Sequence, residues 1–447
     1  MDWILSLLST LAIFAAALLI LVFFHELGHF IAAKIFGMRV ERFSLGFPPR
    51  IFGIKKGETD YCISATPLGG YVKISGMIDE SMDTDYLEEE PKPWEFRSKP
   101  VWQRIIVISA GVIFNMILAV LIYSSLAFTT GDMKVDINSV DGIYVQQGSL
   151  ASQVGFKTGD KLAGVNGHKV KYFQDLFAPN EMTASSLSYI VLRNGKKMTI
   201  PVADSLLNDI GKKGFISLSN AMPNLPINRV VDGTPADKAG LQSGDKIVAI
   251  NGQPMHYMDQ TISTISHSKD TLSLAIKRDG AIKHIDVMPN ANNKLGVVFQ
   301  PSIADNFDVE RFNYGLFASL KVGVQKTNDT VTGILQGFKK MFSGAISVRQ
   351  NLGGPVAIAN VTKQATEAGG AVGFWNITAF LSITLAIMNI LPIPVLDGGH
   401  LMFLIYEGIT RREPSPKVRM ALQQIGFLLI IALFIFVTFN DILRQFG

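Results

Sequence analysis

Residues 3–24 read WILSLLSTLAIFAAALLILVFF and lead directly into His25-Glu26-Leu27-Gly28-His29. The run carries no charge, and a helix of its length rises about 33 Å, enough to cross a hydrocarbon core of roughly 30 Å. Ionisable side chains in a membrane helix are costly and are functional by default. The stretch therefore predicts a membrane-spanning helix that ends in a functional cluster of ionisable residues.

Three further uncharged runs are long enough to span a bilayer: Ile105–Phe128, Ala368–Leu396 and Met420–Asn440. The composition agrees, since 48% of the 447 residues are hydrophobic and 17% are charged. Met1-Asp2 is acidic where a cleaved signal peptide needs basic residues, so the first run is interpreted as a membrane helix. The net charge of +4 gives no indication of nucleic-acid binding, and the single cysteine, Cys62, excludes an intramolecular disulfide.

Basic residues in the loops predict how the chain is oriented in the membrane. Lys and Arg are frequent in residues 34–104 and again in residues 411–419, so both segments are expected on the cytoplasmic side. Both ends of the chain and the long stretch 129–367 are then expected on the opposite side. Long loops cross a membrane regardless of their charge, so the composition of 129–367 does not bear on this orientation.

The long outer stretch contains an internal repeat. Residues 155–167 read GFKTGDKLAGVNG, and residues 240–252 read GLQSGDKIVAING. Asn-Gly between apolar runs is a strong hairpin signal, and each copy ends in it. The spacing of the copies fits two tandem domains better than a solenoid, whose repeats run about 20–50 residues.

The segment His25 to His29 has the H-E-x-x-H pattern of a zinc site. Residues four apart share one face of a helix, so His25 and His29 can bind one metal while Glu26 serves as general base. A catalytic zinc takes three protein ligands. Asp397 is the expected third ligand, because it follows a long apolar run at a point where Pro392 and Pro394 break the helix, and broken backbone at membrane depth must face protein or a wet cavity. His400 is the alternative.

Two other segments are assigned from local pattern. Residues 61–77 are interpreted as a hairpin whose strands flank a Pro-Leu-Gly-Gly turn. Residues 312–342 carry apolar side chains at helical spacing and predict one or two amphipathic helices, which either lie on the membrane surface or pack against the rest of the protein.

The segment 233–252 resembles the core of a bacterial PDZ domain, and 148–167 resembles a diverged copy, with Ser149-Leu150-Ala151-Ser152 where Ser-Pro-Ala-Ala is usual. PDZ domains bind extended chain ends by strand addition. The expected peptide-binding loop of the second copy comprises Gly214, Phe215, Ile216, Ser217 and Leu218. The alternative is that the copies bind no chain end and act as rigid spacers.

The metal motifs, the PDZ pair and the four spans together resemble the site-2 protease family of intramembrane zinc metalloproteases, in its bacterial two-PDZ branch. The resemblance covers essentially the whole chain. It implies one Zn²⁺ held by His25, His29 and Asp397, with Glu26 activating water. It also implies substrate contacts from Asn389, Pro392 and Pro394, and from a membrane-reentrant β-loop whose edge strand comprises Gly69, Gly70, Tyr71, Val72, Lys73, Ile74 and Ser75.

What the family does is then the expectation for this chain. It is an endopeptidase of the bacterial inner membrane that cuts the transmembrane segments of single-pass proteins, such as an anti-sigma factor in the envelope stress response, and remnant signal peptides. Cleavage follows prior trimming of the substrate's periplasmic part, and the PDZ tandem gates access. The active site is expected near the cytoplasmic side, with the PDZ domains and both chain ends in the periplasm.

The expected fold is a polytopic α-helical membrane protein with four transmembrane helices, a cytoplasmic-side β-hairpin and two tandem PDZ-like α+β domains. The expected segments are a first span with H-E-x-x-H (1–37), a cytoplasmic loop with the hairpin (38–104), a second span (105–130), PDZ domains (131–213 and 214–300), an amphipathic helical segment (301–370), a broken third span (371–410), a cytoplasmic loop (411–419) and a fourth span with the tail (420–447).

Two other functions compete with proteolysis. A non-catalytic membrane scaffold would use the PDZ pair to bind chain ends and would not need Glu26. A metal transporter would need intramembrane ionisable groups along a path. Here those groups cluster at one depth, which favours the protease.

Overall fold

The structure is a computed structural model, and it describes residues 2–77, 90–182, 184, 186–203, 205–207, 210, 215–343 and 353–446. The chain divides into two compact units. One comprises residues 1–131, 313–335 and 348–447, and the other comprises residues 132–312 and 336–347.

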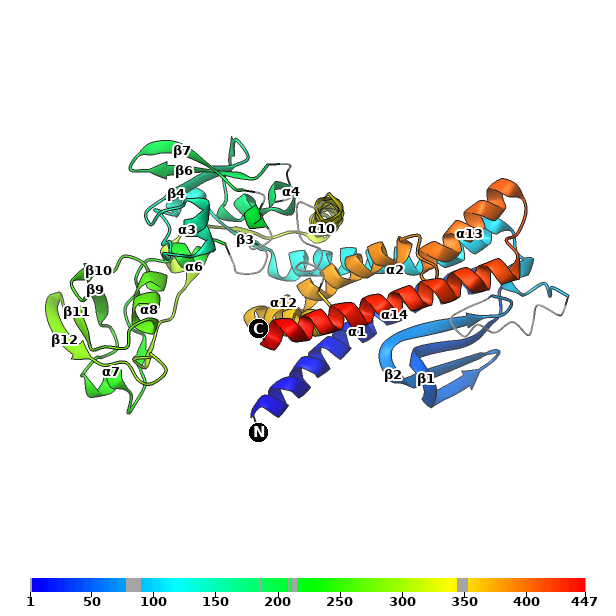
Figure 1. Cartoon of the computed structure of the whole chain (residues 1–447), viewed down its shortest axis with the longest axis horizontal. Coiled ribbons are helices and arrows are strands. Elements are labelled where there is room, and N and C mark those ends of the chain that lie inside the picture. The colour runs from blue at the N-terminus through cyan, green and yellow to red at the C-terminus, as the bar shows by residue number, and fades with distance from the viewer. Residues whose placement is uncertain are drawn as a thin grey trace. The chain divides into compact units, whose positions relative to one another are not determined.

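The first unit is built from long apolar helices: α1 (Asp2–Ile35), α2 (Val101–Thr130), α12 (Pro355–Ile390) and α14 (Pro416–Phe446), with the shorter α13 (Asp397–Thr410) between the last two (Figure 1). By length and composition, four stretches can cross a membrane: Leu8–Ile35, Val101–Thr130, Pro355–Ile390 and Lys417–Asp441. The expected polytopic membrane protein with four spans is confirmed at this level.

The third span differs from its predicted bounds. Residues 371–410 were expected to form one broken helix, but α12 already begins at Pro355 and ends at Ile390. Gly370 interrupts it with a left-handed backbone, φ 56°. The loop 391–396, which contains Pro392 and Pro394, then separates α12 from α13. The helix break at Pro392 and Pro394 was therefore predicted correctly, and the interruption at Gly370 coincides with the expected border between the helical segment 301–370 and the third span.

Helices α1, α2 and α12 pack against one another and form the centre of this unit. Close approach of α1 and α2 depends on small residues. A Cβ atom on Gly28 of α1 would overlap the backbone carbonyl of Ala110 in α2. Because glycine has no Cβ, the two backbones can approach closely at the level of the H-E-x-x-H motif, as in other membrane helix pairs.

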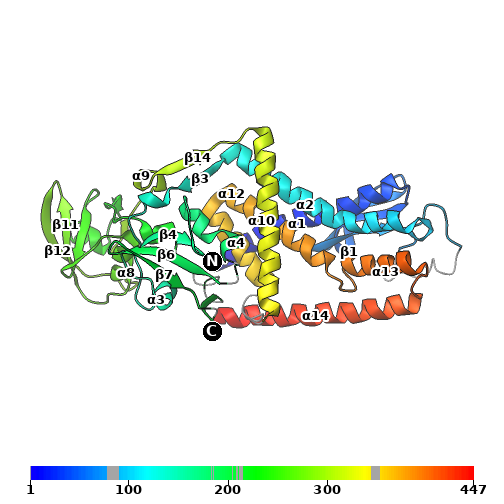
Figure 2. The ribbon, with the colours of Figure 1, turned by 90° about the horizontal axis from the view of Figure 1, so that it is seen from above.

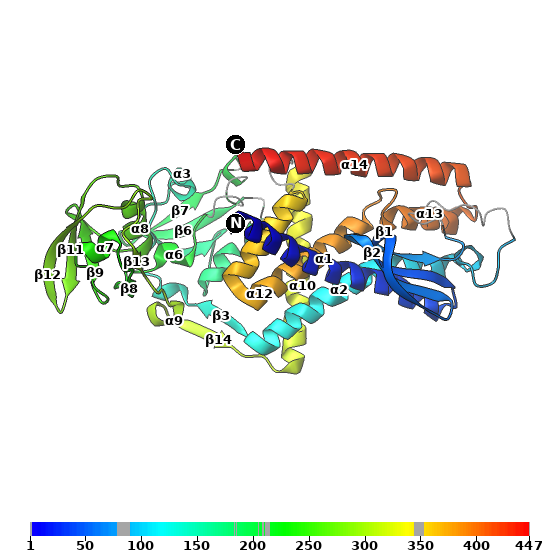
Figure 3. The same cartoon turned by 90° about the horizontal axis from the view of Figure 1, so that it is seen from below.

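A twisted antiparallel sheet, β1 (Val40–Lys56) with β2 (Thr59–Ile74), lies beside α1 (Figure 3). Both long strands bend, so each contributes two stretches. Residues 42–47 pair with 60–66 on one side, residues 40–45 pair with 70–74 on the other, and residues 50–56 pair with 59–64. The predicted pairing of 61–66 with 71–75 is therefore wrong. The Pro-Leu-Gly-Gly signal was local, whereas both stretches pair with a strand that precedes them in the chain.

Helix α10 (Leu316–Phe342) confirms the helix predicted for 312–342 and crosses the direction of α2 (Figure 2). Its buried residues are Ser319, Gly323 and Thr327. A Cβ atom on Gly323 would overlap the Ser124 hydroxyl of α2. The absence of a side chain at Gly323 thus allows α10 to approach α2.

The second unit contains two sheets of the same form. One has the order β5-β4-β6-β7 and the other the order β10-β9-β11-β12, and all neighbouring strands are antiparallel. The first sheet and its helices comprise α3 (Leu150–Val154), β4 (Lys161–Val165), β5 (His168–Lys169), α4 (Pro179–Met182), β6 (Ser188–Arg193) and β7 (Lys196–Pro201). The second comprises α7 (Pro235–Lys238), β9 (Lys246–Ile250), β10 (Gln253–Pro254), α8 (Met258–Ser266), β11 (Leu272–Arg278) and β12 (Ala281–Val287).

Equivalent ion pairs, each with a fully buried aspartate, occur in both sheets. Arg193 binds Asp160 through two hydrogen bonds of 2.7 Å, and Arg278 binds Asp245 through bonds of 2.6 and 2.7 Å. Each arginine also donates to the carbonyl of the glycine that opens its repeat, Gly155 or Gly240. The Gly-Asp turn of the repeated sequence thus has the same structural role in both copies. It places the aspartate carboxylate within hydrogen-bonding distance of an arginine on the third strand of each sheet.

Short elements connect and flank these sheets: the 3-10 turns Ile137–Ser139 and Phe173–Phe177, helices α6 (Leu218–Ala221) and α9 (Ile303–Asn306), and strands β3 (Asp132–Val135), β8 (Arg229–Val230), β13 (Val297–Val298) and β14 (Val309–Phe312). A further 3-10 turn, Phe96–Ser98, precedes α2 in the first unit. Strand β14 pairs with β3, and β13 pairs with β8. Strand β14 lies within 301–370, a segment that was expected to be helical throughout.

The segment proposed as a peptide-binding loop lies at the boundary between the two sheets. Gly214 lies outside the described residues. Ile216 is buried in the hydrophobic cluster of the first sheet, and Phe215 and Leu218 pack against that cluster. Phe215 makes edge contacts with Phe156, with ring centroids 5.4 Å apart. These side chains pack with the hydrophobic core of the first sheet. Residues just after the expected domain boundary at 214 therefore still belong to that core.

Candidate metal centre

Three potential metal ligands meet where α1, α2 and α13 come together. His25 and His29 lie one turn apart on α1, and Asp397 is the first residue of α13. The Oδ2 atom of Asp397 is 3.2 Å from His25 Nε2 and 3.4 Å from His29 Nε2, and the two Nε2 atoms are 3.3 Å apart. These are the residues that the sequence predicted, and the structure brings all three together.

The triangle has the size that zinc requires. Bonds of about 2.0–2.1 Å to a tetrahedral Zn²⁺ place neighbouring ligand atoms about 3.3–3.4 Å apart, which matches all three edges. Asp397 Oδ2 is also buried without a hydrogen-bond partner. Two imidazole nitrogens face each other, and the carboxylate oxygen beside them has no hydrogen-bond partner. One cation bound by all three atoms explains both observations. The residues therefore fit a zinc ion with a fourth position left open.

The far side of His29 fixes its protonation. His29 Nδ1 lies 2.8 Å from the backbone carbonyl of Val107, which can only accept a hydrogen bond. Nδ1 must therefore carry the proton, and Nε2 is left with a lone pair directed at the metal position. A hydrogen bond of this kind on the outer nitrogen orients a ligating histidine and raises its basicity.

Asn115 of α2 has the corresponding place behind His25, and the sequence interpretation missed it. Its side chain is fully buried and lies 3.4 Å from His25 Nδ1, while its Oδ1 has no partner. The two ends of an amide are interchangeable in such a structure. With Oδ1 facing His25, Asn115 accepts a hydrogen bond from the Nδ1–H group, its oxygen gains a partner, and the lone pair of Nε2 is free to bind metal. The sequence signal that could have identified Asn115 is its amide side chain in the apolar run 105–128, where a polar group needs a hydrogen-bond partner.

Glu26 lies beside the ligands and is also buried. It belongs to the helix that carries both histidines, and it lines the same cavity as they do. A Cβ atom on Gly70 of β2 would lie 3.2 Å from Glu26 Cγ, so the strand approaches the glutamate closely because Gly70 has no side chain. Glu26 thus lines the cavity of the three ligands and lies against the strand.

The cavity at the metal position has a volume of about 80 Å³, and one water needs roughly 10–15 Å³ of such space. It is lined by the three ligands, by Glu26 and by Gly70, Tyr71, Val72, Ile74, Met77, Ile108, Val395 and His400. Four of the seven predicted residues of the edge strand therefore face the site. The space admits several waters or a short extended peptide segment, but not a helix about 10–12 Å wide.

The loop before Asp397 contributes the remaining predicted residues. Asn389, near the end of α12, places Nδ2 3.2 Å from His25 Nε2. Pro392 and Pro394 lie in the loop 391–396. Val395, between Pro394 and Asp397, has φ 90°, a conformation that is strained for a β-branched residue and that is found at functional sites. His400 lines the cavity, one turn beyond Asp397, and is not one of the three converging ligands.

The profile of peptidase family M50 matches residues 13–433, nearly the whole chain. The chain belongs to peptidase family M50, the site-2 proteases. A relative from Haemophilus influenzae, named Regulator of sigma E protease, is 32% identical over 98% of this chain and 100% of its own length. Regulator of sigma-E protease RseP of Escherichia coli is 32% identical over the same shares. A relative from Neisseria meningitidis, whose name describes a zinc metalloprotease, is 30% identical over 98% of the chain.

Membership in M50 makes this protein a zinc metalloendopeptidase and a polytopic membrane protein. The triangle of His25, His29 and Asp397 agrees with zinc as the cofactor. The expectation of a zinc-dependent protease, which began with five residues at the end of one apolar run, is confirmed.

Proposed function

We propose that this M50 peptidase hydrolyses peptide bonds within the transmembrane segments of single-pass membrane proteins. One observation carries the proposal: the general base Glu26, the three metal ligands and one strand of the sheet line the same cavity, which belongs to the unit with the membrane-spanning helices. Glu26, His25 and His29 all lie on the first span, and Asp397 follows the third.

Substrate binding begins with unwinding. A transmembrane helix keeps its backbone hydrogen bonds internal, so its peptide bonds are shielded from attack. Among the described residues, 70–74 pair on one side only, with 40–45. The other side of this strand can offer backbone hydrogen bonds to an extended substrate in place of those lost on unwinding.

The chemistry then uses the residues around the metal position. A bound Zn²⁺ supplies Lewis-acid activation of water and of the scissile carbonyl. Glu26 accepts the proton of the attacking water and delivers it to the leaving amide nitrogen. His29 is held by Val107 and His25 by Asn115, so the ligands need no rearrangement. Asn389, 3.2 Å from His25 Nε2, is placed to hold the carbonyl oxygen of the bond under attack.

The names of the relatives support a proposal for the biological role. Two of them are named as regulators of sigma E. We therefore place this chain in the bacterial inner membrane, acting on an anti-sigma factor in the envelope stress response and on remnant signal peptides. The repeated sheets act as PDZ domains on the periplasmic side, where both chain ends lie, while the active site lies near the cytoplasmic face. In this arrangement the PDZ pair excludes substrates that still carry a bulky periplasmic part.

The test of proteolysis uses purified wild type and Glu26→Gln with a single-pass model substrate, and zinc is quantified in both. Equal zinc with cleavage by the wild type alone supports the proposal. Equal cleavage by both proteins would remove Glu26 from the mechanism. A wild type that binds zinc yet cuts no trimmed substrate, while its soluble repeats capture chain ends, would favour a non-catalytic scaffold.

Gating by the soluble repeats needs a separate experiment. Deleting residues 134–290 should allow cleavage of a substrate with a large folded periplasmic domain, which the intact enzyme leaves uncut. A trimmed version of the same substrate should be cut by both proteins, which shows that the deletion variant is active. Unchanged selectivity would reject the gate.

A further inference from the structure

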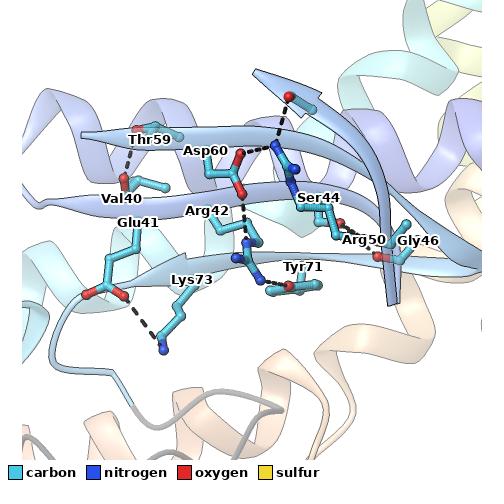
Figure 4. Close-up of polar contacts among 12 residues, drawn as sticks. Val40, Glu41, Arg42, Ser44, Gly46, Arg50, Thr59, Asp60, Tyr71 and Lys73 are labelled. Atoms are coloured by element: carbon cyan, nitrogen blue, oxygen red, sulfur yellow. Dashed lines mark hydrogen bonds and ion pairs between the residues drawn. The ribbon is translucent and has the colours of Figure 1, made fainter. Parts of the chain in front are cut away.

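A chain of polar contacts crosses the β1–β2 sheet and ends on the strand that lines the metal cavity (Figure 4). Asp60 accepts from Arg50 at 3.1 Å and from Arg42 at 3.3 Å, and Arg42 in turn donates to the hydroxyl of Tyr71 at 3.1 Å. The four residues belong to four successive stretches of the sheet: 50–56, 59–66, 40–47 and 69–74. The contacts therefore connect the outermost stretch to the edge strand at the active site.

The stability of the fold does not explain this chain of contacts. Arg42 and Arg50 are about two-fifths exposed, and ion pairs of that exposure contribute about 0–1 kcal/mol. The geometry is nevertheless specific. Arg42 uses Nε for Asp60 and Nη1 for Tyr71, so its planar guanidinium is held in one orientation by two partners. Such a group fixes position better than it adds stability.

The edge strand needs this support because its backbone pairing is irregular. Ile74 pairs with Val40, but Lys73 pairs with Arg42, so Glu41 is an extra residue in the ladder. A bulge of this kind bends a strand and re-aims its side chains. Glu41 accepts from Ser75 at 2.8 Å and lies 3.7 Å from Lys73. Consecutive residues of the central strand, Glu41 and Arg42, thus hold the side chains of the edge strand on one face.

Tyr71 receives the last contact, and its ring is held as well. It stacks on Phe47 with the ring planes 3° apart and the centroids 6.4 Å apart. Tyr71 also lines the metal cavity, next to Gly70, whose backbone lies against Glu26. A shift of Tyr71 therefore moves the segment that sets the distance between a bound substrate and the general base.

We propose that Arg42 is a positioning residue for proteolysis, acting through Tyr71 to fix the register and tilt of residues 69–74 for the incoming substrate. The inference rests on the proposed function, because it assumes that this strand receives the unwound substrate. Asp60 and Arg50 hold Arg42 in its working orientation. Arg42 itself touches neither the metal ligands nor Glu26 in the structure.

The test compares Arg42→Gln, Arg42→Lys and Tyr71→Phe with the matched control Lys55→Gln, an exposed cation of the same sheet. Each variant is assayed in the full-length protein on two single-pass substrates. One has a stable helix at the cleavage site, and the other carries helix-breaking residues there. Bound zinc and thermal stability are measured for every variant.

A misplaced strand should penalise mainly the substrate that has to be unwound. We expect kcat/KM on the stable helix to fall about tenfold in Arg42→Gln and Tyr71→Phe, mostly through KM, and less than about threefold on the pre-broken helix. Arg42→Lys should recover part of the loss. Zinc content should match the wild type. The double variant Arg42→Gln/Tyr71→Phe should lose no more kcat/KM than either single variant, because each single substitution removes the same contact.

Three outcomes would overturn the inference: full activity of Arg42→Gln on the stable helix, equal losses on both substrates, or additive losses in the double variant. Equal losses with less zinc or a lower melting temperature would mean that Arg42 only supports the fold. Failure of the proposed function looks different, because the wild type itself would then cut neither substrate.

Discussion

Gly111 of α2 lies so close to the imidazole of His29 that a single added methyl group would overlap the ring Nε2. The same methyl carbon would lie 2.7 Å from His25 Cε1. Alanine favours a helix over glycine by about 1 kcal/mol, so a loss in Gly111→Ala cannot come from helix propensity. The imidazole rings of His25 and His29 therefore pack directly against the backbone of α2 at Gly111.

Gly111→Ala is expected to bind zinc at least about tenfold more weakly and to lose proteolysis in proportion, because both imidazoles must move. Zinc titration with a competing chelator gives the affinity. Gly337→Ala in α10, where an added methyl group meets nothing within 4 Å, is the matched control and should behave as the wild type. Wild-type zinc affinity in Gly111→Ala would contradict the packing described here.

Asn115 gives a prediction that depends on hydrogen-bond direction. If its oxygen accepts from His25 Nδ1, Asn115→Asp keeps the acceptor and should keep zinc. Asn115→Leu has similar volume and no acceptor, and it should weaken zinc binding about 10- to 100-fold, as is usual for an outer partner of a ligating histidine. Equal zinc affinity in the Leu and Asp variants would show that Asn115 does not orient His25.

The choice of Asp397 over His400 as third ligand can be checked by metal content alone. Asp397→Asn should lose most bound zinc, because an amide oxygen is a weaker ligand than a carboxylate oxygen that lies 3.2 Å from His25 Nε2. His400→Gln should retain zinc at the wild-type stoichiometry. The reverse pattern would exchange the roles of the two residues.

A buried ion pair joins α2 to α13. The side chains of Arg104 and Glu407 are 5% and 10% exposed, and Arg104 Nη2 donates to Glu407 Oε1. Without Glu407, the buried Arg104 keeps only the exposed Glu413, 3.7 Å away, as its counter-charge, so Glu407→Met should destabilise the protein by about 3 kcal/mol, measured by unfolding in detergent. Arg104→Met/Glu407→Met should recover much of that loss. Lys34→Gln, in the more exposed pair with Glu58, should cost no more than about 1 kcal/mol.

Asp245 predicts a pH dependence in the second repeat. Burial raises the pKa of this carboxyl, but hydrogen bonds from Arg278 and from the Gln242 N–H outweigh burial, and the pKa lies below its ordinary value. A depressed pKa stabilises the fold above the unfolded value of about 3.9 and loses that contribution as pH falls through the folded value. Asp245→Asn should therefore be less stable than the wild type at pH 7, by about 3 kcal/mol, with the difference shrinking below about pH 4.

Hydrogen-exchange protection of β9 and β11, corrected for intrinsic rates, measures this difference in the full-length protein. Asp286→Asn, an exposed position on β12, serves as the control and should change protection little at either pH. If the stability difference between Asp245→Asn and the wild type stayed constant from pH 7 to pH 3.5, the charge of the carboxylate would not be the source of the stabilisation by Arg278.

The parts that sequence alone predicted are those in which chemistry and position agree within a short stretch. His25, Glu26 and His29 follow one apolar run, and Asp397 follows a helix break marked by two prolines. Length and hydropathy were enough for the four spans. A membrane demands long apolar helices and penalises every stray charge, so both signals are strong.

The parts that sequence missed depend on partners distant in the chain. The pairing of 70–74 with 40–45 has no local signature, and the Pro-Leu-Gly-Gly turn suggested a different partner. Asn115 becomes meaningful only when α2 lies against His25. The packing of Phe215 with Phe156 likewise needs the fold of the first repeat before it can be seen. Long-range pairing and close packing are set by the three-dimensional structure, and a local reading cannot reach them.

The distance along the chain between His29 and Asp397 has a consequence for biosynthesis. The helix with both histidines is made before the third ligand, which appears only after residues 30–396 have also been made. At about 5–20 residues per second, that interval lasts roughly 20–70 s. A nascent chain inserted in the membrane during this time lacks a complete metal site, so the enzyme cannot cut neighbouring helices before Asp397 has been made.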